Sequence, residues 1–339
     1  MPDNYRSQKV LVTGAGGFIA SHLVEALVQQ GASVRAFVRY NSRGDPGLLN
    51  LLPAETLGKV EIIAGDLRDL TAMKDAMQGT QIVFHLGALI AIPYSYVHPA
   101  EVVESNVLGT LNVLLAGREL GVERIVHTSS SEVYGTARYV PIDESHPLQG
   151  QSPYSASKIA ADKIAESFQL SFELPVLTLR PFNTYGPRQS TRAVIPTIIT
   201  QVLSGEVVRL GNLEARRDLT YVSDTVAGFL LAGQVPGIEG MTINLGTGRE
   251  VSILELANAI IQLSGRSLGR SLGRSPRIET DSERLRPSKS EVDRLLSDNR
   301  LAQQALGWQP KIELEEGLRR TIAWIADNLE RYRPGRYQI

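Results

Sequence analysis

The chain contains no cysteine. Disulfide bonds, thiolate metal ligands and cysteine nucleophiles are therefore excluded, and a reducing compartment is compatible with this composition. Net charge is almost absent as well, because 35 Lys and Arg residues are balanced by 36 Asp and Glu residues. A surface of this kind has no basic footprint for nucleic acid or for an anionic membrane, so we expect neither as a partner.

Long apolar runs are also missing. Residues Met1 to Lys9 are polar and lack the hydrophobic segment of a signal peptide, and no later apolar run is long enough to span a bilayer. We expect a soluble, cytoplasmic protein. Its 339 residues suit a large α/β unit with a smaller appended lobe.

Residues 1–180 alternate short β-branched runs with longer amphipathic stretches, a pattern typical of βαβ units and a parallel sheet. The expected strands are Val10–Thr13, Ser33–Val38, Val60–Ala64, Ile82–Leu86, Arg124–Ser129 and Val176–Leu179. The expected helices are Phe18–Gln30, Asp69–Met77, Pro99–Leu120 and Tyr154–Phe172. We predict an α/β fold with a Rossmann-type, doubly wound parallel sheet that binds NAD(P).

Residues 181–339 have a looser pattern, and we expect a smaller α/β lobe for the substrate, with some crossing of the chain between lobes. Its predicted elements are a helix near Val194–Leu203, strands at Val207–Leu210 and Thr242–Leu245, and terminal helices containing Trp308 and Trp324. Residues Gly265–Ser275 read GRSLGRSLGRS, a tandem repeat whose Gly and Ser content favours a surface loop. A basic clamp on a phosphate-bearing ligand is the alternative.

A glycine-rich turn follows the first expected strand. Gly14, Gly17 and Ala20 open the first helix there. The first glycine permits a tight turn, the second lets a pyrophosphate approach the backbone, and a small third residue allows close packing of helix on strand. The N–H groups at the helix start then face the phosphates, so we predict a dinucleotide site at this turn.

The end of the second strand bears on the choice of cofactor. Val38 stands where an acid usually bonds the adenosine ribose of NAD, and the loop after it contains the arginines and polar residues Arg39, Asn41, Ser42 and Arg43. Since no carboxylate repels a 2′-phosphate there and arginine pairs well with phosphate, we expect NADP. NAD stays open if these arginines are solvated loop charges. Asp66 is placed either to accept from the adenine amino group or to cap its own loop.

Tyr154 and Lys158 are four residues apart at an expected helix start, so both side chains lie on one face. A free phenol has a pKa of about 10, and a neighbouring ammonium stabilises the phenolate and brings that pKa toward neutrality. We predict that Tyr154 takes a proton from an alcohol while hydride leaves for a nicotinamide.

The fifth expected strand ends in Ser130, Ser131 and Glu132, at the carboxyl edge where open α/β sheets place their chemistry. Ser130 is suited to bond a substrate hydroxyl. Glu132 is suited to deprotonate a carbon made acidic by a neighbouring ketone. A cap or loop carboxylate is the alternative interpretation of Glu132.

These motifs together resemble the extended short-chain dehydrogenase/reductase family, in its nucleotide-sugar class, over essentially the whole chain. The resemblance rests on TGAGGFIA (13–20), GDLRD (65–69), HLGA (85–88), SSEVYG (130–135), YSASK (154–158), RPFNTYGPR (180–188), RRDLTYVSD (216–224) and LRPSKSEV (285–292). The pair Ser131-Glu132 is similar to that of sugar 4,6-dehydratases. IAIPYSY (90–96) and PLQGQSPYSASK (147–158) are most similar to the UDP-N-acetylglucosamine 4,6-dehydratases of legionaminic acid biosynthesis.

This resemblance implies a closed cycle on an NDP-hexose: oxidation at C4, removal of the C5 proton by Glu132, loss of water from C6 and return of hydride to C6. The product is a 4-keto-6-deoxy sugar, and the tightly bound cofactor is regenerated. Many 4,6-dehydratases have aspartate where this chain has Ser131, so either Glu132 serves both proton transfers or Ser131 relays one.

The resemblance also implies further contacts, and no metal. The additional cofactor contacts are Phe18, Ile19, Leu67, Leu86 and Ala88. The substrate contacts are Asn183, Val194, Arg217 and Arg286. A homodimer is implied through a four-helix interface of residues 106–120 and 154–172.

Three other functions stay open. A UDP-glucuronate decarboxylase also oxidises C4 and also carries Ser-Glu before Val-Tyr-Gly, and a nucleotide-sugar C4 epimerase shares the Tyr-Lys pair. A non-catalytic, dinucleotide-sensing regulator would keep the Rossmann fold but would need none of Tyr154, Lys158 and Glu132.

Overall fold

The computed structural model describes residues 5–205, 207–267 and 276–332. Its largest element is a seven-stranded parallel sheet made of β1 (Lys9–Thr13), β2 (Ser33–Arg39), β3 (Val60–Gly65), β4 (Ile82–His85), β5 (Arg124–Thr128), β6 (Val176–Pro181) and β10 (Thr242–Leu245). The strand order is β10-β6-β5-β4-β1-β2-β3. The order reverses direction beside β1, as in a doubly wound sheet, and the predicted fold class is confirmed.

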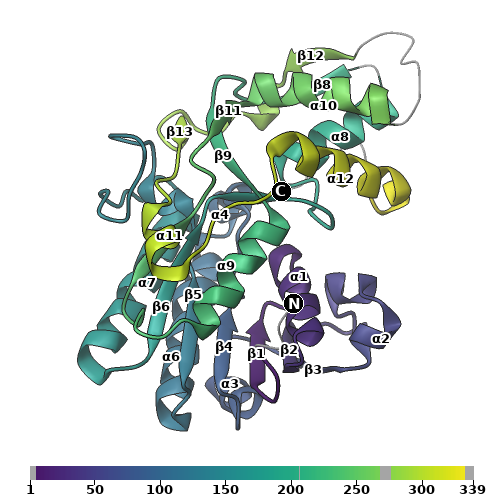
Figure 1. Ribbon diagram of the computed structural model, residues 1–339. Helices are drawn as coiled ribbons and strands as arrows, with labels where there is room; N and C mark the ends of the chain where they lie inside the picture. Colours follow the sequence, from purple (N-terminus) through teal and green to yellow (C-terminus); the bar gives the residue numbers. More distant parts are fainter. Residues whose placement is uncertain (1–4, 206, 268–275, 333–339) are drawn as a thin grey trace.

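Helices cover both faces of this sheet (Figure 1). Helices α1 (Phe18–Gln29) and α9 (Val222–Gln234) pack together on one face, and α3 (Leu70–Met77), α6 (Gly109–Leu120) and α7 (Pro153–Phe172) pack on the other. Strand β1 shows why both faces must be covered: Val10 and Val12 belong to the core under α1, and Leu11 belongs to the core under α3 and α6. Strands buried on both faces have such continuous apolar runs.

One predicted helix contains an irregular segment. Instead of a single α-helix over residues 99–120, the chain forms α5 (Pro99–Val103), the π-helical turn η2 (Glu104–Leu108) and then α6. The remaining short elements of this part of the chain are η1 (Gly47–Leu51), α2 (Ala54–Leu57), α4 (Ile92–Val97) and η3 (Ser131–Tyr134). Single π-turns inside helices are frequent at functional sites.

The second lobe contains two small sheets. One consists of β7 (Asn183–Tyr185), β9 (Arg216–Tyr221), β11 (Glu250–Ser252) and β13 (Arg294–Leu295), and the other pairs β8 (Val207–Leu210) with β12 (Arg277–Thr280). Around them lie α8 (Val194–Ser204), α10 (Ile253–Ser267), η4 (Ser282–Arg284), α11 (Arg300–Leu306), α12 (Leu314–Asp327) and η5 (Leu329–Arg331).

Three expectations about this part of the chain are corrected. Residues Thr242–Leu245 form β10, which pairs with β6 at the edge of the main sheet and not with the second lobe. Trp308 lies outside any helix, because α11 ends at Leu306 and Gly307 adopts a left-handed conformation with φ of 64°. Helix α10 continues through the first three residues of the tandem repeat, and residues 268–275 of the repeat lie outside the described residues.

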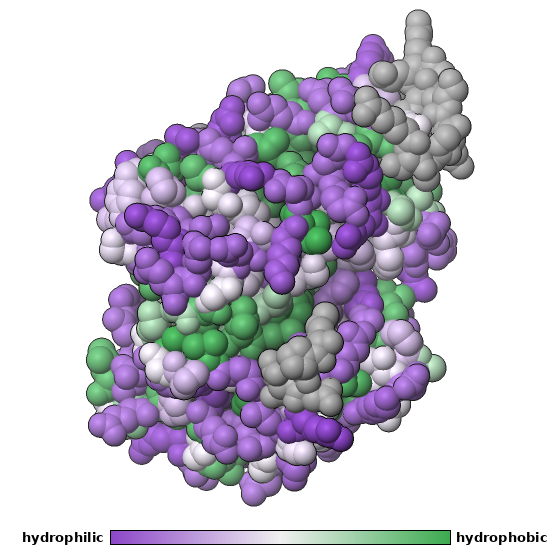
Figure 2. Space-filling model, viewed as in Figure 1, coloured by the Kyte–Doolittle hydropathy of each residue, from purple (hydrophilic) through white to green (hydrophobic). Residues whose placement is uncertain are grey.

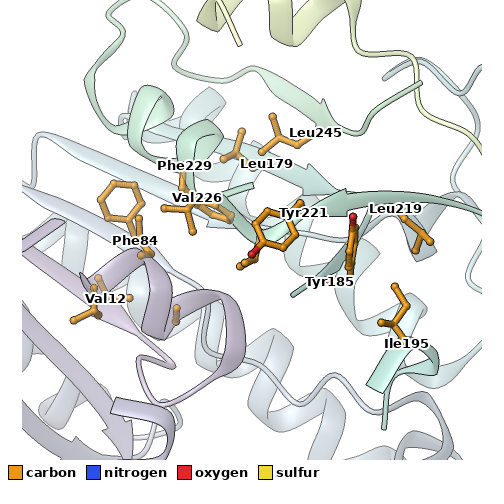
Figure 3. Close-up of a cluster of buried hydrophobic side chains, with 14 of the residues drawn as sticks. Val12, Phe84, Leu179, Tyr185, Ile195, Leu219, Tyr221, Val226, Phe229 and Leu245 are labelled. Atoms are coloured by element: carbon orange, nitrogen blue, oxygen red, sulfur yellow. The ribbon is translucent and has the colours of Figure 1, made fainter. Parts of the chain in front are cut away.

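A shared core joins the two lobes (Figure 3). It runs from the main sheet through α9 to the small sheet of β7 and β9, and includes Val12, Phe84, Leu179, Leu245, Val226, Phe229, Tyr185, Leu219, Tyr221 and Ile195. Each lobe therefore buries part of the other, and the active-site residues of the two lobes have one rigid base.

The face drawn in Figure 2 is mostly polar, with a band of hydrophobic residues between its upper and lower parts. Among the residues that the structure describes, no helix is both long and apolar enough to cross a membrane.

Candidate active site

The turn between β1 and α1 has the backbone that a dinucleotide needs. Gly14 has a φ of +66°, and a Cβ at this residue would lie 2.6 Å from the Cα of Gly87, so only glycine fits. Gly17 caps α1 without a side-chain hydrogen bond, which leaves the first N–H groups of the helix for a ligand. The hydroxyl of Thr13 fixes the facing loop by accepting from the N–H of Gly87 at 3.1 Å.

A cavity of about 130 Å³ adjoins this turn. Its lining brings together five of the predicted cofactor residues, namely Gly14, Arg39, Asp66, Leu67 and Ala88, with Phe37 and Gly87. Leu86 follows β4 directly, and its backbone lies next to Gly14. Phe18 and Ile19 are the first two residues of α1 and are half-buried. The residues present therefore fit an adenosine-bearing cofactor across the strand ends.

The loop after β2, which contains the residues predicted to favour NADP, is exposed. Arg39 is 67% exposed and pairs with Glu101, with Nη2 and Oε1 3.2 Å apart. Asn41 accepts from the N–H of Arg43 at 3.2 Å, so it shapes the exposed turn that contains Ser42 and Arg43. The sequence analysis missed Glu101, whose carboxylate weakens the attraction of Arg39 for a 2′-phosphate.

Asp66 caps its own loop, the alternative role that the sequence left open. Its Oδ1 accepts from the N–H of Arg68 at 2.9 Å, and the Arg68 guanidinium binds the same carboxylate. The hydrogen bond from Arg68 holds the pKa of Asp66 below its usual value. Arg68 also reaches Glu104 at 3.0 Å, which ties this loop to η2.

Tyr154 and Lys158 lie one turn apart at the start of α7. The helix begins there because Ser152 and Ser155 form a reciprocal capping box and Pro153 occupies the first helical position. Both side chains are buried, with Tyr154 only 7% and Lys158 only 3% exposed. The Nζ of Lys158 donates to the carbonyl oxygen of Thr128, at the end of β5, at 2.6 Å.

The pKa shift of Tyr154 is opposite in direction to the one expected from the sequence. Burial raises the pKa of Tyr154 to about 12, partly offset by a hydrogen bond with Ser130 and reinforced by the charge of Glu132. Burial lowers the pKa of Lys158 to about 8. Burial, the largest cause of the shift, therefore acts against the expected fall of the phenol pKa toward neutrality.

The short turn η3 places the carboxylate of Glu132 near the phenol of Tyr154. Ser130 caps η3, where its hydroxyl accepts from the N–H of Glu132 at 3.2 Å. Ser130 and Glu132 both act on the pKa of Tyr154, so the structure brings these three predicted residues together. The Ser131 side chain, by contrast, is buried, with an exposed fraction of 2%.

Cations from the second lobe face Glu132. The Nη1 of Arg286 lies 3.9 Å from Oε2 of Glu132. Burial lowers the pKa of Arg217. The charge of Glu132 raises this pKa and the charge of Arg286 lowers it, so the three side chains are close neighbours. Arg217 also approaches Glu291 at 3.5 Å.

Unsatisfied polar atoms mark the same region. The Nδ2 of Asn183 and the Nη1 of Arg286 are buried without a hydrogen-bond partner among the described residues. Buried polar atoms are normally bonded, so such donors indicate a polar ligand. Val194 is the first residue of α8 and is half-buried. The donors and cations suit an anionic, oxygen-rich molecule.

Asn106 orders the catalytic helix from the π-helical turn. Its Nδ2 donates to the backbone oxygen of Leu89 at 2.9 Å and to Oγ of Ser157 at 3.0 Å. Ser157 in turn donates to the backbone oxygen of Tyr154 at 2.7 Å. These hydrogen bonds tie the π-helical turn to the start of α7.

A buried polar network under α7 was missed by the sequence analysis. Asp162 accepts from His127, Ser129 and Arg180, side chains of β5, the residue after it and β6. The available signal was the spacing, because Asp162 continues the face of Tyr154 and Lys158 by one more turn.

A parallel sheet with a glycine turn after β1 and a buried Tyr-Lys pair on α7 defines an extended short-chain dehydrogenase/reductase. The sequence model of the GDP-mannose 4,6 dehydratase family matches residues 11–321, and the chain belongs to this family. Among the described residues, no group of three His, Asp or Glu side chains is placed to hold a metal ion.

Relatives include both dehydratases and epimerases. The chain is 32% identical to a dTDP-D-glucose 4,6-dehydratase of Mus musculus, over 98% of this chain and 92% of the relative. It is 33% identical to a UDP-glucose 4-epimerase of Mycolicibacterium smegmatis, over 94% and 98%. The structure of a dTDP-glucose 4,6-dehydratase from Streptomyces venezuelae with NAD bound superposes with a TM-score of 0.83 at 29% identity, covering 96% of this chain and 99% of that one. The protein is thus an enzyme of the nucleotide-sugar dehydratase and epimerase group.

Proposed function

We propose that this protein is a nucleotide-sugar 4,6-dehydratase that converts an NDP-hexose, with UDP-N-acetylglucosamine as the first candidate, into its 4-keto-6-deoxy derivative. The observation that carries the proposal is the position of Glu132, a carboxylate near enough to Tyr154 to raise the pKa of its phenol. Epimerisation at C4 needs one proton acceptor, whereas elimination across C5 and C6 needs a second.

The steps follow from these groups. Tyr154 Oη takes the proton of the C4 hydroxyl, and Ser130 orients that hydroxyl. A bound nicotinamide supplies the acceptor for the C4 hydride and, later in the turnover, the donor of the same hydride. The 4-ketone makes the C5 proton acidic, Glu132 removes that proton, and the C6 hydroxyl takes up a proton and leaves as water. Glu132 returns the proton to the leaving hydroxyl directly or through the hydroxyl of Ser131, since both residues lie on η3. Hydride then returns to C6 and a proton to C5, which gives the 4-keto-6-deoxy sugar.

For the cofactor, the pairing of Arg39 with Glu101 supports NAD over the NADP that the sequence favoured. A 2′-phosphate at Arg39 would approach the Glu101 carboxylate. Comparing the Kd of NAD and NADP by calorimetry tests this, and Glu101→Gln should narrow any preference for NAD. Tighter binding of NADP to the unaltered protein would restore the original prediction.

Substrate binding is assigned to Asn183, Val194, Arg217 and Arg286. Their unsatisfied donors and two cations suit a diphosphate, for which arginine offers bidentate hydrogen bonds. A homodimer through α6 and α7 is part of the proposal. Two apolar side chains at the end of α7 are exposed, Leu170 at 72% and Phe172 at 47%, and a second copy would cover them.

The deciding experiment incubates the purified protein with a panel of nucleotide sugars under mass spectrometry. Loss of one water from UDP-N-acetylglucosamine is the expected result. Loss of carbon dioxide from UDP-glucuronate, with the rest of the panel unchanged, would establish a decarboxylase instead. Interconversion of C4 epimers without loss of mass, read by NMR, would favour the epimerases among the relatives.

A further inference from the structure

Helix α7 carries a buried acid that the steps above do not use. Asp162 lies one turn after Lys158 and two turns after Tyr154, and it is 4% exposed. An ionised carboxylate is costly to bury unless hydrogen bonds and opposite charges compensate for the loss of water. The cost of burying Asp162 one turn after Lys158 must therefore be offset by specific contacts.

Three donors hold this carboxylate in one orientation. Oδ1 accepts from Nε2 of His127 at 3.1 Å. Oδ2 accepts from Oγ of Ser129 at 2.8 Å and from the guanidinium of Arg180 at 2.9 Å. The three donors come from adjacent positions of the main sheet. The carboxylate is therefore held against the sheet beneath α7.

The acid remains ionised in this setting. Burial alone would raise the pKa of Asp162, but the hydrogen bond with His127 and the charges of Arg180 and Lys158 outweigh burial and leave that pKa below its usual value. Arg180 is further fixed by the hydroxyl of Tyr134, to which its Nη1 donates at 2.9 Å. A permanent negative charge therefore stands one helical turn from Lys158.

Lys158 has few other sources of support for its charge. The titratable groups that interact with it are Asp162 on α7, His85 on β4 and His127 on β5. Arg180 on β6 pairs with Asp162 and not with Lys158. Burial lowers the pKa of Lys158, and Asp162 is the neighbour that raises it. Both histidines have lowered pKa values through burial and are neutral at neutral pH.

We propose that Asp162 is a positioning residue whose buried charge keeps Lys158 cationic at neutral pH, so that the lysine can stabilise the Tyr154 phenolate. This role rests on the proposed use of the Tyr154–Lys158 pair in C4 oxidation. Asp162 acts through Lys158 and touches neither substrate nor cofactor.

The test compares Asp162→Asn with the matched control Glu166→Gln, an exposed acid one turn further along α7 that pairs with Lys163 at 2.6 Å. Protein labelled with ¹³C-lysine is titrated by NMR, with the Lys158 signal assigned from Lys158→Met. We expect D162N to reduce the ratio of charged to neutral Lys158 at a given pH about tenfold, which corresponds to a change of one in pKa. E166Q should leave the Lys158 titration unchanged, and Asp162→Glu should largely restore it.

Activity gives a second, separate measurement. The rate of D162N should fall at lower pH than that of the unaltered enzyme, while its KM stays the same. An unchanged Lys158 titration in D162N overturns the proposal. If the Lys158 titration shifts but no nucleotide sugar is converted by the unaltered protein, the proposed function fails and the charge coupling stands.

Loss of one member of a buried ion pair is strongly destabilising, so D162N could fail to fold. The double variant D162N/R180M covers that outcome, because replacing both members is tolerated far better than removing one. Asp162 and Arg180 also line a cavity of about 480 Å³, whose walls include α7, β6 and residues 144–148. Because R180M also removes a positive charge, the double variant is compared with R180M alone. A Lys158 pKa that is no lower in D162N/R180M than in R180M would count against the proposal.

Discussion

Replacing Glu132 with glutamine separates the two proton transfers of the proposed reaction. The amide keeps the shape of the side chain and its position 3.9 Å from Arg286, but it cannot accept the C5 proton. A positioned general base contributes about 10²–10⁴-fold to a rate, so dehydration should slow by that factor. Oxidation at C4 should survive, since Tyr154 and Lys158 are unchanged.

The structure also fixes the direction of a pH effect in this variant. The charge of Glu132 raises the pKa of Tyr154, so its removal should lower that pKa and move C4 oxidation to lower pH. In single-turnover reactions, E132Q should accumulate reduced nicotinamide, seen by its near-ultraviolet absorbance, without loss of water from the sugar. NMR in D₂O should show that deuterium no longer enters C5.

The matched control is Glu144→Gln, a partly buried carboxylate that accepts from the N–H of Asn244 at 2.8 Å. It should dehydrate normally. Dehydration by E132Q within a few-fold of the normal rate would refute the assignment of Glu132 as the C5 base. Equal loss of C4 oxidation and dehydration would mean that Glu132 acts before the elimination.

Four further outcomes are expected. Turnover should fall as pH rises through about 8, because Lys158 then loses the proton that stabilises the phenolate, and a rate unchanged across that range would contradict this role. Tyr154→Phe should abolish C4 oxidation yet bind NAD with unchanged Kd in calorimetry. Gly14→Ala should lose cofactor binding, since its Cβ would lie 2.6 Å from the backbone of Gly87 and its φ is positive, and full binding would show that the turn can relax. Gly233→Ala should lower the free energy of unfolding in urea by about 1–3 kcal/mol, because the added carbon would lie 2.6 Å from the ring of Phe84 and overpack the core. An unchanged free energy would imply a more open site.

The main sheet was predictable because its information is local. Continuous apolar runs such as that of β1 indicate buried parallel strands, and the glycine turn after β1 fixes the start of α1. Strand β10 was assigned to the wrong lobe, because a four-residue strand does not reveal which neighbour it pairs with. The end of α11 before Trp308 was readable in principle, since Gly307 is a typical helix C-terminal residue.

The active site was predictable where one element supplies the residues. Tyr154 and Lys158 are related by helical spacing, and Ser130 and Glu132 by a single short turn. The Glu101 partner of Arg39 and the three donors to Asp162 come from distant parts of the chain, and no spacing rule connects them. The shift of the Tyr154 pKa was missed for a related reason: it follows from burial in the folded chain, which helical spacing does not reveal.

The arrangement explains how one fold serves both epimerases and dehydratases. Tyr154 and Lys158 lie on a long helix tied to the sheet through Thr128, so the oxidising pair is held by the core. Glu132 lies on η3, a turn of four residues whose orientation depends on the Ser130 cap and on the positive φ of Gly135. Under the proposed mechanism, a substitution confined to this turn would remove the base for C5 and leave the Tyr154–Lys158 pair in place. Reaction type in this family should therefore follow the residues of η3 more closely than overall identity, which is nearly equal for the dehydratase and the epimerase relatives.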